Sequence, residues 1–215
     1  MPSSDDSPQP TRLILVRHGE SEGNRDRTFT QHSDVPLTPL GRQQARASAH
    51  RIAARFRPAR VVASPFARAR ETAEIIAATF DLPVDLEPAL REQSFGVFAG
   101  QPYESLLTDA AYHQGPRWRW RPRGGESLVD VYDRVAPALD RLASVHAGSD
   151  VIVVSHGGVM LAVCAYVTGS WDGLAVTPNA GVVVIEHRHG TYTPPVVIAD
   201  DASTAPVSEQ YPEKR

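Results

Sequence analysis

The strongest constraint on the fold is an alternation along the chain between short β-branched runs and longer segments in which apolar residues recur at helical spacing. Strands that alternate with helices favour an α/β domain with a mainly parallel sheet. We therefore expect a three-layer αβα sandwich, with helices on both faces of the sheet. The expected strands are 13–16, 60–63, 151–155 and 182–186, with further candidates near 84–86 and 195–198.

Capping residues and prolines mark where the helices should begin. A hydroxyl side chain that precedes a proline can cap a helix, and the proline fits the first helical turn. A serine followed three residues later by an acidic residue resembles a capping box. The expected starts are therefore Thr38-Pro39, Ser64-Pro65, Ser127 with Asp130, and Gly157-Gly158. Residues 93–125 lack clean periodicity, so we expect an irregular insert over the C-terminal edge of the sheet.

The patterned part of the chain should form a single domain between two loose tails. Of the 215 residues, 41% are hydrophobic and 22% are charged, which is typical of a soluble globular protein. Residues 1–10 and 200–215 are rich in Ser, Asp, Pro and Glu and offer little apolar surface to offset the entropy of ordering. We expect disordered tails there and one α/β domain over residues 11–199.

Charge and apolar pattern limit the partners and the location. The formal net charge is -3 and the signs are interspersed, so nothing points to nucleic acid or to an anionic membrane surface. No apolar stretch is long enough to span a bilayer, and the N-terminus does not resemble a secretory signal, so the cytoplasm is the expected location. A monomer and a homodimer both stay open, because an exposed apolar stripe cannot be told from core.

One type of corner occurs twice: a strand runs directly into a histidine followed by a glycine. Residues 13–16 lead to Arg17 and His18, and residues 151–154 lead to His156. Ligands bind at the carboxyl ends of parallel strands, so both histidines should meet at one edge if their strands are neighbours. The glycine permits a tight turn and lets backbone N–H groups approach an anion. The two corners therefore predict one functional site.

Phosphoryl transfer explains the residue types at these corners. A phosphomonoester carries close to two negative charges, and its transition state spreads charge over three oxygens, which calls for guanidinium groups and N–H donors. Arg17 supplies one guanidinium group. Arg68 is the expected second, because it lies in the first turn of its helix, whereas Arg70 should face solvent. Asn24 can donate an amide N–H to the same phosphate.

A nucleophile and an acid would complete this chemistry. As a nucleophile, His18 needs its attacking nitrogen unprotonated and its other nitrogen held by a hydrogen bond, for example to a backbone carbonyl. The departing alkoxide needs a proton from a carboxylic acid whose pKa is raised in a partly apolar setting. Glu92, beside Phe95, and Glu20, beside the nucleophile, both meet this description, and residue chemistry alone does not decide between them.

In their order along the chain, these residues resemble the histidine phosphatase superfamily of phosphoglycerate-mutase-like enzymes. The segment 17–21 with Asn24 is similar to its first motif, and residues 64–73 are similar to its Ser-Pro-x-x-Arg-Ala-x-x-Thr-Ala motif. The other matches are Pro36-Leu37-Thr38 with Gly41, the segment 91–96, Gly125-Glu126-Ser127 and Ser155-His156-Gly157. So many ordered matches over residues 12–186 make chance implausible.

The resemblance implies a role for each residue of the site. His18 would accept the phosphoryl group. The phosphate pocket would consist of Arg17, Arg68 and His156, helped by Asn24 and the backbone of Gly157. The resemblance selects Glu92 over Glu20 as the proton donor, and the same carboxylate would later activate water. No metal and no organic cofactor is implied, since arginines and histidines would do the charge work of magnesium.

The superfamily contains phosphatases and mutases, which differ in whether water or a second acceptor captures the phosphohistidine. Mutases resemble longer chains with a lysine eleven residues past the acid, where this chain has Tyr103. We therefore expect a phosphatase for small phosphorylated substrates, similar to the small, broad-acting members. A cofactor-dependent phosphoglycerate mutase is the alternative, favoured by Phe29-Thr30. Thr30 and residues 93–125 should contact the substrate, and the Arg/Trp stretch 117–121 is either a carboxylate site or a solvated basic face over packed rings.

Other functional classes have weaker support. A serine hydrolase of the nucleophile-elbow type needs Gly-x-Ser-x-Gly, which the sequence lacks. His187 and His189 should share a strand face, but carboxylate partners for a metal site are absent at suitable spacing. A non-catalytic phosphate-binding module is the other alternative. The presence of every residue of the expected set speaks against it.

Overall fold

Seven strands form one sheet among the residues that the structure describes. The computed structural model describes residues 9–30 and 32–198, so the expected tails lie outside it except for Gln9 and Pro10. The strands are β1 (Thr11–Arg17), β2 (Pro58–Ala63), β3 (Val84–Leu86), β4 (Asp150–Ser155), β5 (Val182–Arg188), β6 (Thr191–Tyr192) and β7 (Val196–Ile198). Their order is β3-β2-β4-β1-β5-β6, and β7 pairs with β5.

Parallel pairing is confined to the neighbouring strands β3, β2, β4 and β1. The C-terminal strands β5, β6 and β7 pair antiparallel, beginning with β5 against β1. β1 and β4 are neighbours, and their register sets Arg17 opposite Ser155. His18 and His156, which follow these two residues, therefore emerge at the same edge of the sheet.

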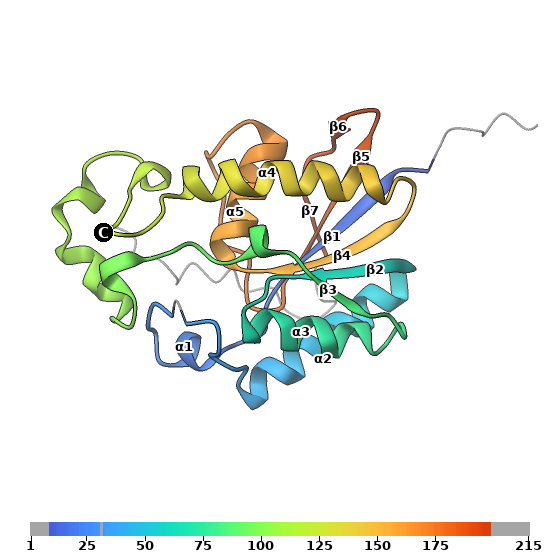
Figure 1. Ribbon diagram of the computed structural model, residues 1–215, viewed down its shortest axis with the longest axis horizontal. Coiled ribbons are helices and arrows are strands. Elements are labelled where there is room, and N and C mark those ends of the chain that lie inside the picture. The colour runs from blue at the N-terminus through green and yellow to red at the C-terminus, as the bar shows by residue number, and fades with distance from the viewer. Residues whose placement is uncertain (1–8, 31, 199–215) are drawn as a thin grey trace, which may run out of the picture.

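Helices cover both faces of the sheet, which confirms the expected αβα sandwich (Figure 1). On one face lie α2 (Pro39–Arg55) and α3 (Ala67–Ala77), and on the other lie α4 (Leu128–Val145) and α5 (Gly157–Thr168). Successive side chains of a strand point to opposite faces. Leu13 and Leu15 of β1 accordingly pack with α4 and α5, whereas Ile14 and Val16 pack with α2 and α3. Two apolar cores thus fix the strand that ends at the site.

Three of the four expected helix starts agree with the structure. Thr38 caps α2 by accepting the N–H of Gly41 at 3.0 Å. Ser127 and Asp130 form the capping box of α4. α5 begins at Gly157. At Thr38 and Ser127 the side-chain cap satisfies backbone N–H groups of the first turn, as the sequence predicts.

The expected cap at Ser64 is wrong, because α3 begins only at Ala67. The backbone N–H of Ser64 still donates to the carbonyl oxygen of Val154 at 3.0 Å, so the chain here continues the pairing of β2 with β4. The hydroxyl of Ser64 accepts the N–H of Phe66 at 3.3 Å, so it closes a turn ahead of the helix and does not cap the first turn of α3. The Ser64 hydroxyl instead lies 2.7 Å from Nε2 of His156.

Residues 93–125 form the expected irregular insert, which packs around a small core of its own. Its 3-10 helices are η2 (Gly96–Phe98), η3 (Tyr103–Thr108), η4 (Ala110–His113) and η5 (Arg117–Arg119), preceded along the chain by η1 (Pro88–Leu90). Its core consists of Phe95, Phe98, Tyr103, Leu106, Tyr112 and Trp120, joined by Phe29. The insert lies at the end of the molecule toward which β1 runs (Figure 1).

The end of β5 tests the expected pairing of His187 and His189 on one strand face. β5 ends at Arg188, and His189 lies in the following turn with a φ of 50°. The expectation that His187 and His189 share a strand face is therefore wrong.

In the described part of the chain, every helix falls short of the length and apolarity that crossing a membrane requires.

Candidate active site

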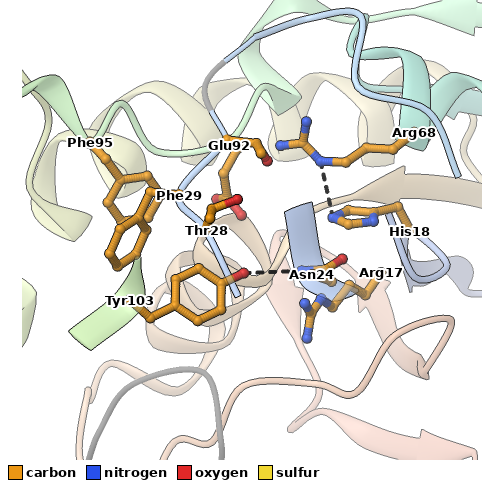
Figure 2. A pocket seen from close by; sticks show the side chains of 10 residues that line it. Arg17, His18, Asn24, Thr28, Phe29, Arg68, Glu92, Phe95 and Tyr103 are labelled. Carbon is orange, nitrogen blue, oxygen red and sulfur yellow. Dashed lines mark hydrogen bonds between the residues drawn. The ribbon is translucent and has the colours of Figure 1, made fainter. Parts of the chain in front are cut away.

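A pocket lies where β1 ends and the insert begins (Figure 2). Its walls come from the loop after β1, from α3, and from the segment that leads into the insert. The lining residues are Arg17, His18, Asn24, Thr28, Phe29, Thr30, Arg68, Glu92, Phe95 and Tyr103. Figure 2 shows the aromatic rings on one side, and His18, Arg17 and Arg68 on the other. The pocket therefore has a charged half and an aromatic half.

His18 is buried in the charged half, and its hydrogen bonds define one tautomer. Its Nδ1 lies 2.7 Å from the carbonyl oxygen of Gly19, which can only accept, so Nδ1 carries the ring proton. Nε2 then holds a lone pair, which accepts the Nε–H of Arg68 at 3.3 Å. A histidine nucleophile requires this arrangement, with one nitrogen anchored and the other unprotonated.

The surroundings of His18 keep its ring neutral. Burial holds the pKa of His18 well below 6.5, and the positive charges of Arg68 and Arg17 lower it further. The hydrogen bond to Gly19 opposes this shift only in part. Nε2 is therefore unprotonated at neutral pH and keeps the lone pair that accepts the Arg68 hydrogen bond.

Arg17 and Arg68 are the two buried guanidinium groups of the pocket, each 2% exposed. Arg17 ends β1 and donates from Nη1 to the carbonyl oxygen of Thr177 at 2.7 Å. Arg68 lies in the first turn of α3, and burial lowers its pKa to about 10, so it remains a cation at neutral pH. Arg70 is exposed and lies 3.5 Å from Glu74, which agrees with its predicted place outside the site.

Glu92 is the carboxyl group of the pocket. Its Oε1 accepts the backbone N–H of Gln93 at 2.9 Å and that of Gly158 at 3.2 Å. Burial raises the pKa of Glu92, although the Gln93 hydrogen bond and nearby arginines oppose the shift. Glu20 does not line the pocket, and its Oε1 accepts the hydroxyl of Thr38 at 2.6 Å. Of the two carboxylates weighed from the sequence, the fold brings Glu92 into the same pocket as His18.

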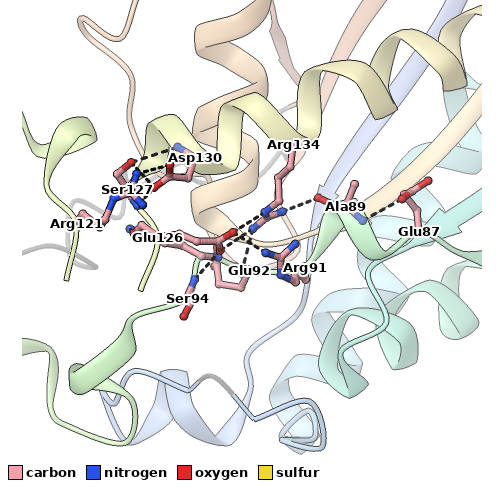
Figure 3. Close-up of polar contacts among 11 residues, drawn as sticks. Glu87, Ala89, Arg91, Glu92, Ser94, Arg121, Glu126, Ser127, Asp130 and Arg134 are labelled. Atoms are coloured by element: carbon pink, nitrogen blue, oxygen red, sulfur yellow. Dashed lines mark hydrogen bonds and ion pairs between the residues drawn. The ribbon is translucent and has the colours of Figure 1, made fainter. Parts of the chain in front are cut away.

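Glu126 and Arg134 hold the segment that carries Glu92 (Figure 3). Arg134 of α4 donates to the carbonyl oxygen of Ala89 at 2.6 Å and to that of Glu92 at 3.2 Å. It also pairs with Glu126 at 3.1 Å, and Glu126 accepts the N–H of Ser94 at 3.0 Å. The sequence marked Glu126 through a family motif but indicated no task for it.

His156 and Gly157 are not among the residues that line the pocket. His156 is fully buried, and its ring centre lies 5.1 Å from that of His18. Gly157 begins α5, and the N–H of the next residue, Gly158, already binds Glu92. A Cβ at Gly158 would lie 2.7 Å from the Glu92 carboxylate, so this second glycine makes room for the acid. The sequence did not indicate this role of Gly158, because a Gly-Gly pair at a helix start does not reveal which distant side chain lies against it.

Asn24 lies in α1 (Glu22–Arg25), a short helix that the sequence patterns did not indicate. Its side-chain oxygen accepts the Ser21 hydroxyl at 3.0 Å and the Asn179 amide at 3.1 Å, which fixes the orientation of the Asn24 amide. Its Nδ2 donates one N–H to the Tyr103 hydroxyl at 3.3 Å. Nδ2 carries a second N–H, and Asn24 is among the residues that line the pocket. Asn179, which also donates to the carbonyl of His18 at 3.1 Å, had no signal in the sequence.

Thr30 lines the pocket as expected, and so do Phe95 and Tyr103 of the 93–125 region, together with Phe29. The ring centres of Phe29 and Phe95 lie 4.4 Å apart, and those of Phe29 and Tyr103 lie 4.7 Å apart. Burial raises the pKa of Tyr103, so its hydroxyl is protonated at neutral pH. The signals for this half were the Phe29-Thr30 pair and the offset of Tyr103 from Glu92.

The Arg/Trp stretch 117–121 does not line the pocket. Trp120 is buried and donates from Nε1 to Asp109 at 3.0 Å. Arg121 is exposed and pairs with Asp130 of α4. Of the two readings of this stretch, the solvated basic face over packed rings agrees with the structure.

The sequence matches one protein family over most of its length. Residues 13–197 match the model of the "Histidine phosphatase superfamily (branch 1)". The chain belongs to the histidine phosphatase superfamily. The resemblance drawn from the ordered motifs is confirmed, and the match extends over almost all of the described residues.

Relatives of this histidine phosphatase superfamily member carry the names of phosphatases and of a mutase-like protein. Phosphoglycerate mutase-like protein 4 of Arabidopsis thaliana is 40% identical over 154 residues, or 69% of this chain and 67% of that protein. The metal-independent phosphoserine phosphatase of Arabidopsis thaliana is 34% identical over 184 residues, or 83% of this chain and 77% of that protein. The structure of a mycobacterial glucosyl-3-phosphoglycerate phosphatase with VO3 has a TM-score of 0.78 and 28% identity, over 89% of this chain and 99% of that chain. These phosphatases support a hydrolase.

Proposed function

We propose that this protein is a metal-independent phosphomonoesterase that acts on small phosphorylated metabolites through a phosphohistidine at His18. The observation that carries the proposal is the neutral His18 ring, whose Nε2 lone pair lies beside the guanidinium group of Arg68. A lone pair among arginine cations combines a nucleophile with neutralisation of the phosphate charge. No metal or organic cofactor takes part, because Arg17 and Arg68 supply the positive charge.

In the first half of the reaction, Nε2 of His18 bonds to phosphorus and the P–O bond to the alcohol breaks. Arg17 and Arg68 bind the phosphoryl oxygens throughout. The Glu92 carboxyl gives its proton to the departing oxygen, so that a neutral alcohol leaves. The raised pKa of Glu92 supplies the protonated form that this step needs. The carbonyl of Gly19, bonded to Nδ1–H, stabilises the positive charge that the phosphorylated ring acquires.

In the second half, the Glu92 carboxylate accepts a proton from water while the water oxygen bonds to phosphorus. The P–N bond to His18 breaks, and inorganic phosphate leaves. Glu92 is again protonated and His18 again neutral, so one water is consumed and each proton is accounted for. Asn24 and the backbone N–H of Gly157 are further donors to the phosphoryl oxygens in this proposal, and Thr30 contacts the alcohol part.

The size of the pocket favours small phosphomonoesters. The cavity has a volume of about 40 Å³. The charged part of this narrow space, lined by Arg17, His18 and Arg68, suits a group as small as a phosphoryl group. The alcohol part would then lie outward, against the aromatic half of the pocket. Small phosphorylated metabolites also fit the names of the relatives, which include a phosphoserine phosphatase.

Hydrolysis of p-nitrophenyl phosphate in the presence of EDTA tests the proposal. The wild-type protein should release p-nitrophenolate at a rate that the chelator does not change. Rapid quenching at neutral or alkaline pH, where phosphohistidine survives, should trap a labelled phosphoenzyme. No turnover by the wild-type protein, or unchanged turnover in His18→Ala, would contradict the proposal and favour a non-catalytic phosphate-binding module.

A cofactor-dependent phosphoglycerate mutase is the second candidate, favoured by the place of both Phe29 and Thr30 in the pocket. Against it, the position of the mutase lysine is occupied by Tyr103, whose hydroxyl is neutral. The test uses 3-phosphoglycerate with and without 2,3-bisphosphoglycerate, and it scores phosphate release and 2-phosphoglycerate formation separately. We expect phosphate release without isomer, and efficient isomerisation would favour the mutase.

A further inference from the structure

His156 is fully buried, yet one of its ring nitrogens has no hydrogen-bond partner. Its Nε2 lies 2.7 Å from the hydroxyl of Ser64, which is also fully buried. Its Nδ1 has no partner among the residues that the structure describes. An unpaired polar group in the interior costs roughly 1–3 kcal/mol, so its retention calls for an explanation.

The ring of His156 carries a single proton at neutral pH. Burial lowers the pKa of His156 well below 6.5. Electrostatic repulsion lowers it further, and it comes from Arg68, His18, Arg17 and Arg134. A neutral imidazole has one N–H and one lone pair. The two nitrogens of His156 must therefore play opposite roles, and the contact with Ser64 decides which is which.

The hydrogen bonds of Ser64 assign these roles. Its Oγ already accepts the backbone N–H of Phe66 at 3.3 Å. Within the described residues, the other hydrogen-bond contact of this hydroxyl is Nε2 of His156. If Nε2–H donated to Ser64, both the hydroxyl hydrogen and the Nδ1 lone pair would be left unpaired. If the hydroxyl donates to Nε2, only the Nδ1–H is left, so this arrangement loses fewer hydrogen bonds.

We propose that the Ser64 hydroxyl donates to Nε2 of His156 and so holds the ring proton on Nδ1, where it serves as a hydrogen-bond donor to the transferred phosphoryl group. Ser64 is then a positioning residue that acts through His156. The inference rests on the proposed phosphatase function, because the phosphoryl group on His18 is the partner that Nδ1–H lacks. It also explains why a serine that fails to cap α3 is fully buried at the end of β2.

The proton position can be read directly in the wild-type protein. A nitrogen–proton correlation spectrum of the isotope-labelled chain distinguishes protonated from unprotonated ring nitrogens. We expect Nδ1 of His156 to be protonated and Nε2 to be unprotonated at neutral pH. The opposite tautomer would overturn the proposal, and this measurement requires no variant to fold.

Ser64→Ala removes the donor and should lower kcat for p-nitrophenyl phosphate by about 10- to 100-fold, with a KM within about threefold of wild type. The spectrum of His156 in Ser64→Ala should show loss of the single tautomer. Thr11→Val is a matched control, because Thr11 is also buried, donates to the carbonyl of Ala143 and accepts the N–H of Gly148. It lies at the other end of β1, so its kcat should stay within about twofold of wild type even if its Tm falls.

A double-mutant cycle separates positioning from general damage. In a His156→Ala background, Ser64→Ala should change kcat by less than about twofold, because the residue through which it acts is gone. A full effect in that background, or a Ser64→Ala kcat near that of wild type, would overturn the proposal. Failure of the phosphatase function itself would look different, since the wild-type protein would then form no phosphoenzyme at His18.

Discussion

The two strand-to-histidine corners share a sequence pattern but engage opposite nitrogens of their rings. In the first corner, Nδ1 of His18 is bonded to the carbonyl of Gly19, and Nε2 carries its lone pair in the pocket. In the second corner, Nε2 of His156 is bonded to Ser64, and Nδ1 has no partner in the described part of the chain. Among the residues described, two corners with the same sequence pattern thus leave different ring nitrogens, Nε2 of His18 and Nδ1 of His156, without a backbone or hydroxyl partner.

The hydrogen-bond partner of each histidine, more than the strand-His-Gly pattern that the two share, determines which ring nitrogen remains for a ligand. The residue that binds Nδ1 of His18 is the next one in the chain, so the contact that sets this tautomer is local. The partner of His156 is 92 positions away, at the end of another strand. The second corner also fixes the acid, since the N–H of Gly158 binds Glu92. In the proposed reaction, the first corner therefore supplies the nucleophile, and the second supplies a hydrogen-bond donor and holds the Glu92 carboxyl group.

Replacing the histidine of the first corner should reduce activity the most. His18→Ala should lower kcat for p-nitrophenyl phosphate by roughly 10,000-fold or more, because the attacking lone pair is lost. It should also abolish the labelled phosphoenzyme. In the wild-type protein, the acid limb of the kcat/KM profile should lie below pH 6.5, because the lowered pKa of His18 keeps the ring neutral to that point. An acid limb at or above pH 6.5 would contradict this account of His18.

The next effect concerns the acid that the second corner holds. Glu92→Gln should lower kcat for alkyl phosphates by about 100- to 10,000-fold. The loss in the phosphoenzyme-forming step should be smaller for p-nitrophenyl phosphate, whose leaving group needs no proton. In the wild-type protein, kcat/KM for alkyl phosphates should fall as the pH rises through the raised pKa of Glu92, because only the protonated carboxyl can donate.

Glu20→Gln is the matched control for the acid. Glu20 lies two residues after His18, but its carboxylate accepts the Thr38 hydroxyl outside the pocket, and glutamine keeps an acceptor there. Its kinetics should resemble those of the wild-type protein. Equal losses in both variants, or equal sensitivity of alkyl and p-nitrophenyl esters to Glu92→Gln, would argue against a specific proton donor at Glu92.

A smaller effect should follow when the second histidine is removed. His156→Ala should lower kcat by about 100- to 1,000-fold, the usual loss for one donor to a transition-state oxyanion. Unlike His18→Ala, it should still form a phosphoenzyme, only more slowly, and rapid-quench labelling can follow this. A His156→Ala protein that folds, as judged by Tm, but never becomes labelled would erase the proposed difference between the corners.

The parts of the site that the sequence predicted well are those fixed by local chemistry. Arg17, His18 and His156 follow β-branched runs directly, and glycines after the histidines mark the turns. Their meeting at one edge required only that β1 and β4 be neighbours, as the structure finds. Arg68 could be preferred over Arg70 because helix geometry allows at most one of the two to face the pocket.

The parts that escaped prediction depend on contacts between distant segments. Ser64 has the pattern of a helix cap, but the pairing of β2 with β4 keeps it extended and gives its hydroxyl to His156. Arg134 and Glu126 brace the Glu92 segment through side chains from α4 and the preceding loop, which no spacing rule encodes. The 3-10 helices of the insert leave no periodicity to read, so the aromatic half of the pocket had little signal beyond the offset of Tyr103.

The smallest expected effect concerns the aromatic half of the pocket. Tyr103→Phe removes the hydroxyl that accepts the Asn24 amide, and kcat/KM should fall only about 2- to 10-fold, the value of one neutral hydrogen bond. Tyr103→Lys should raise the preference for 3-phosphoglycerate over glycerol 1-phosphate, two esters that differ mainly in a carboxylate. Tyr112→Phe is the control, because Tyr112 is buried in the same aromatic core but outside the pocket lining. If Tyr103→Lys left the ratio of kcat/KM for the two esters unchanged, the leaving group would not lie against Tyr103, and selectivity would have to come from elsewhere around the charged half.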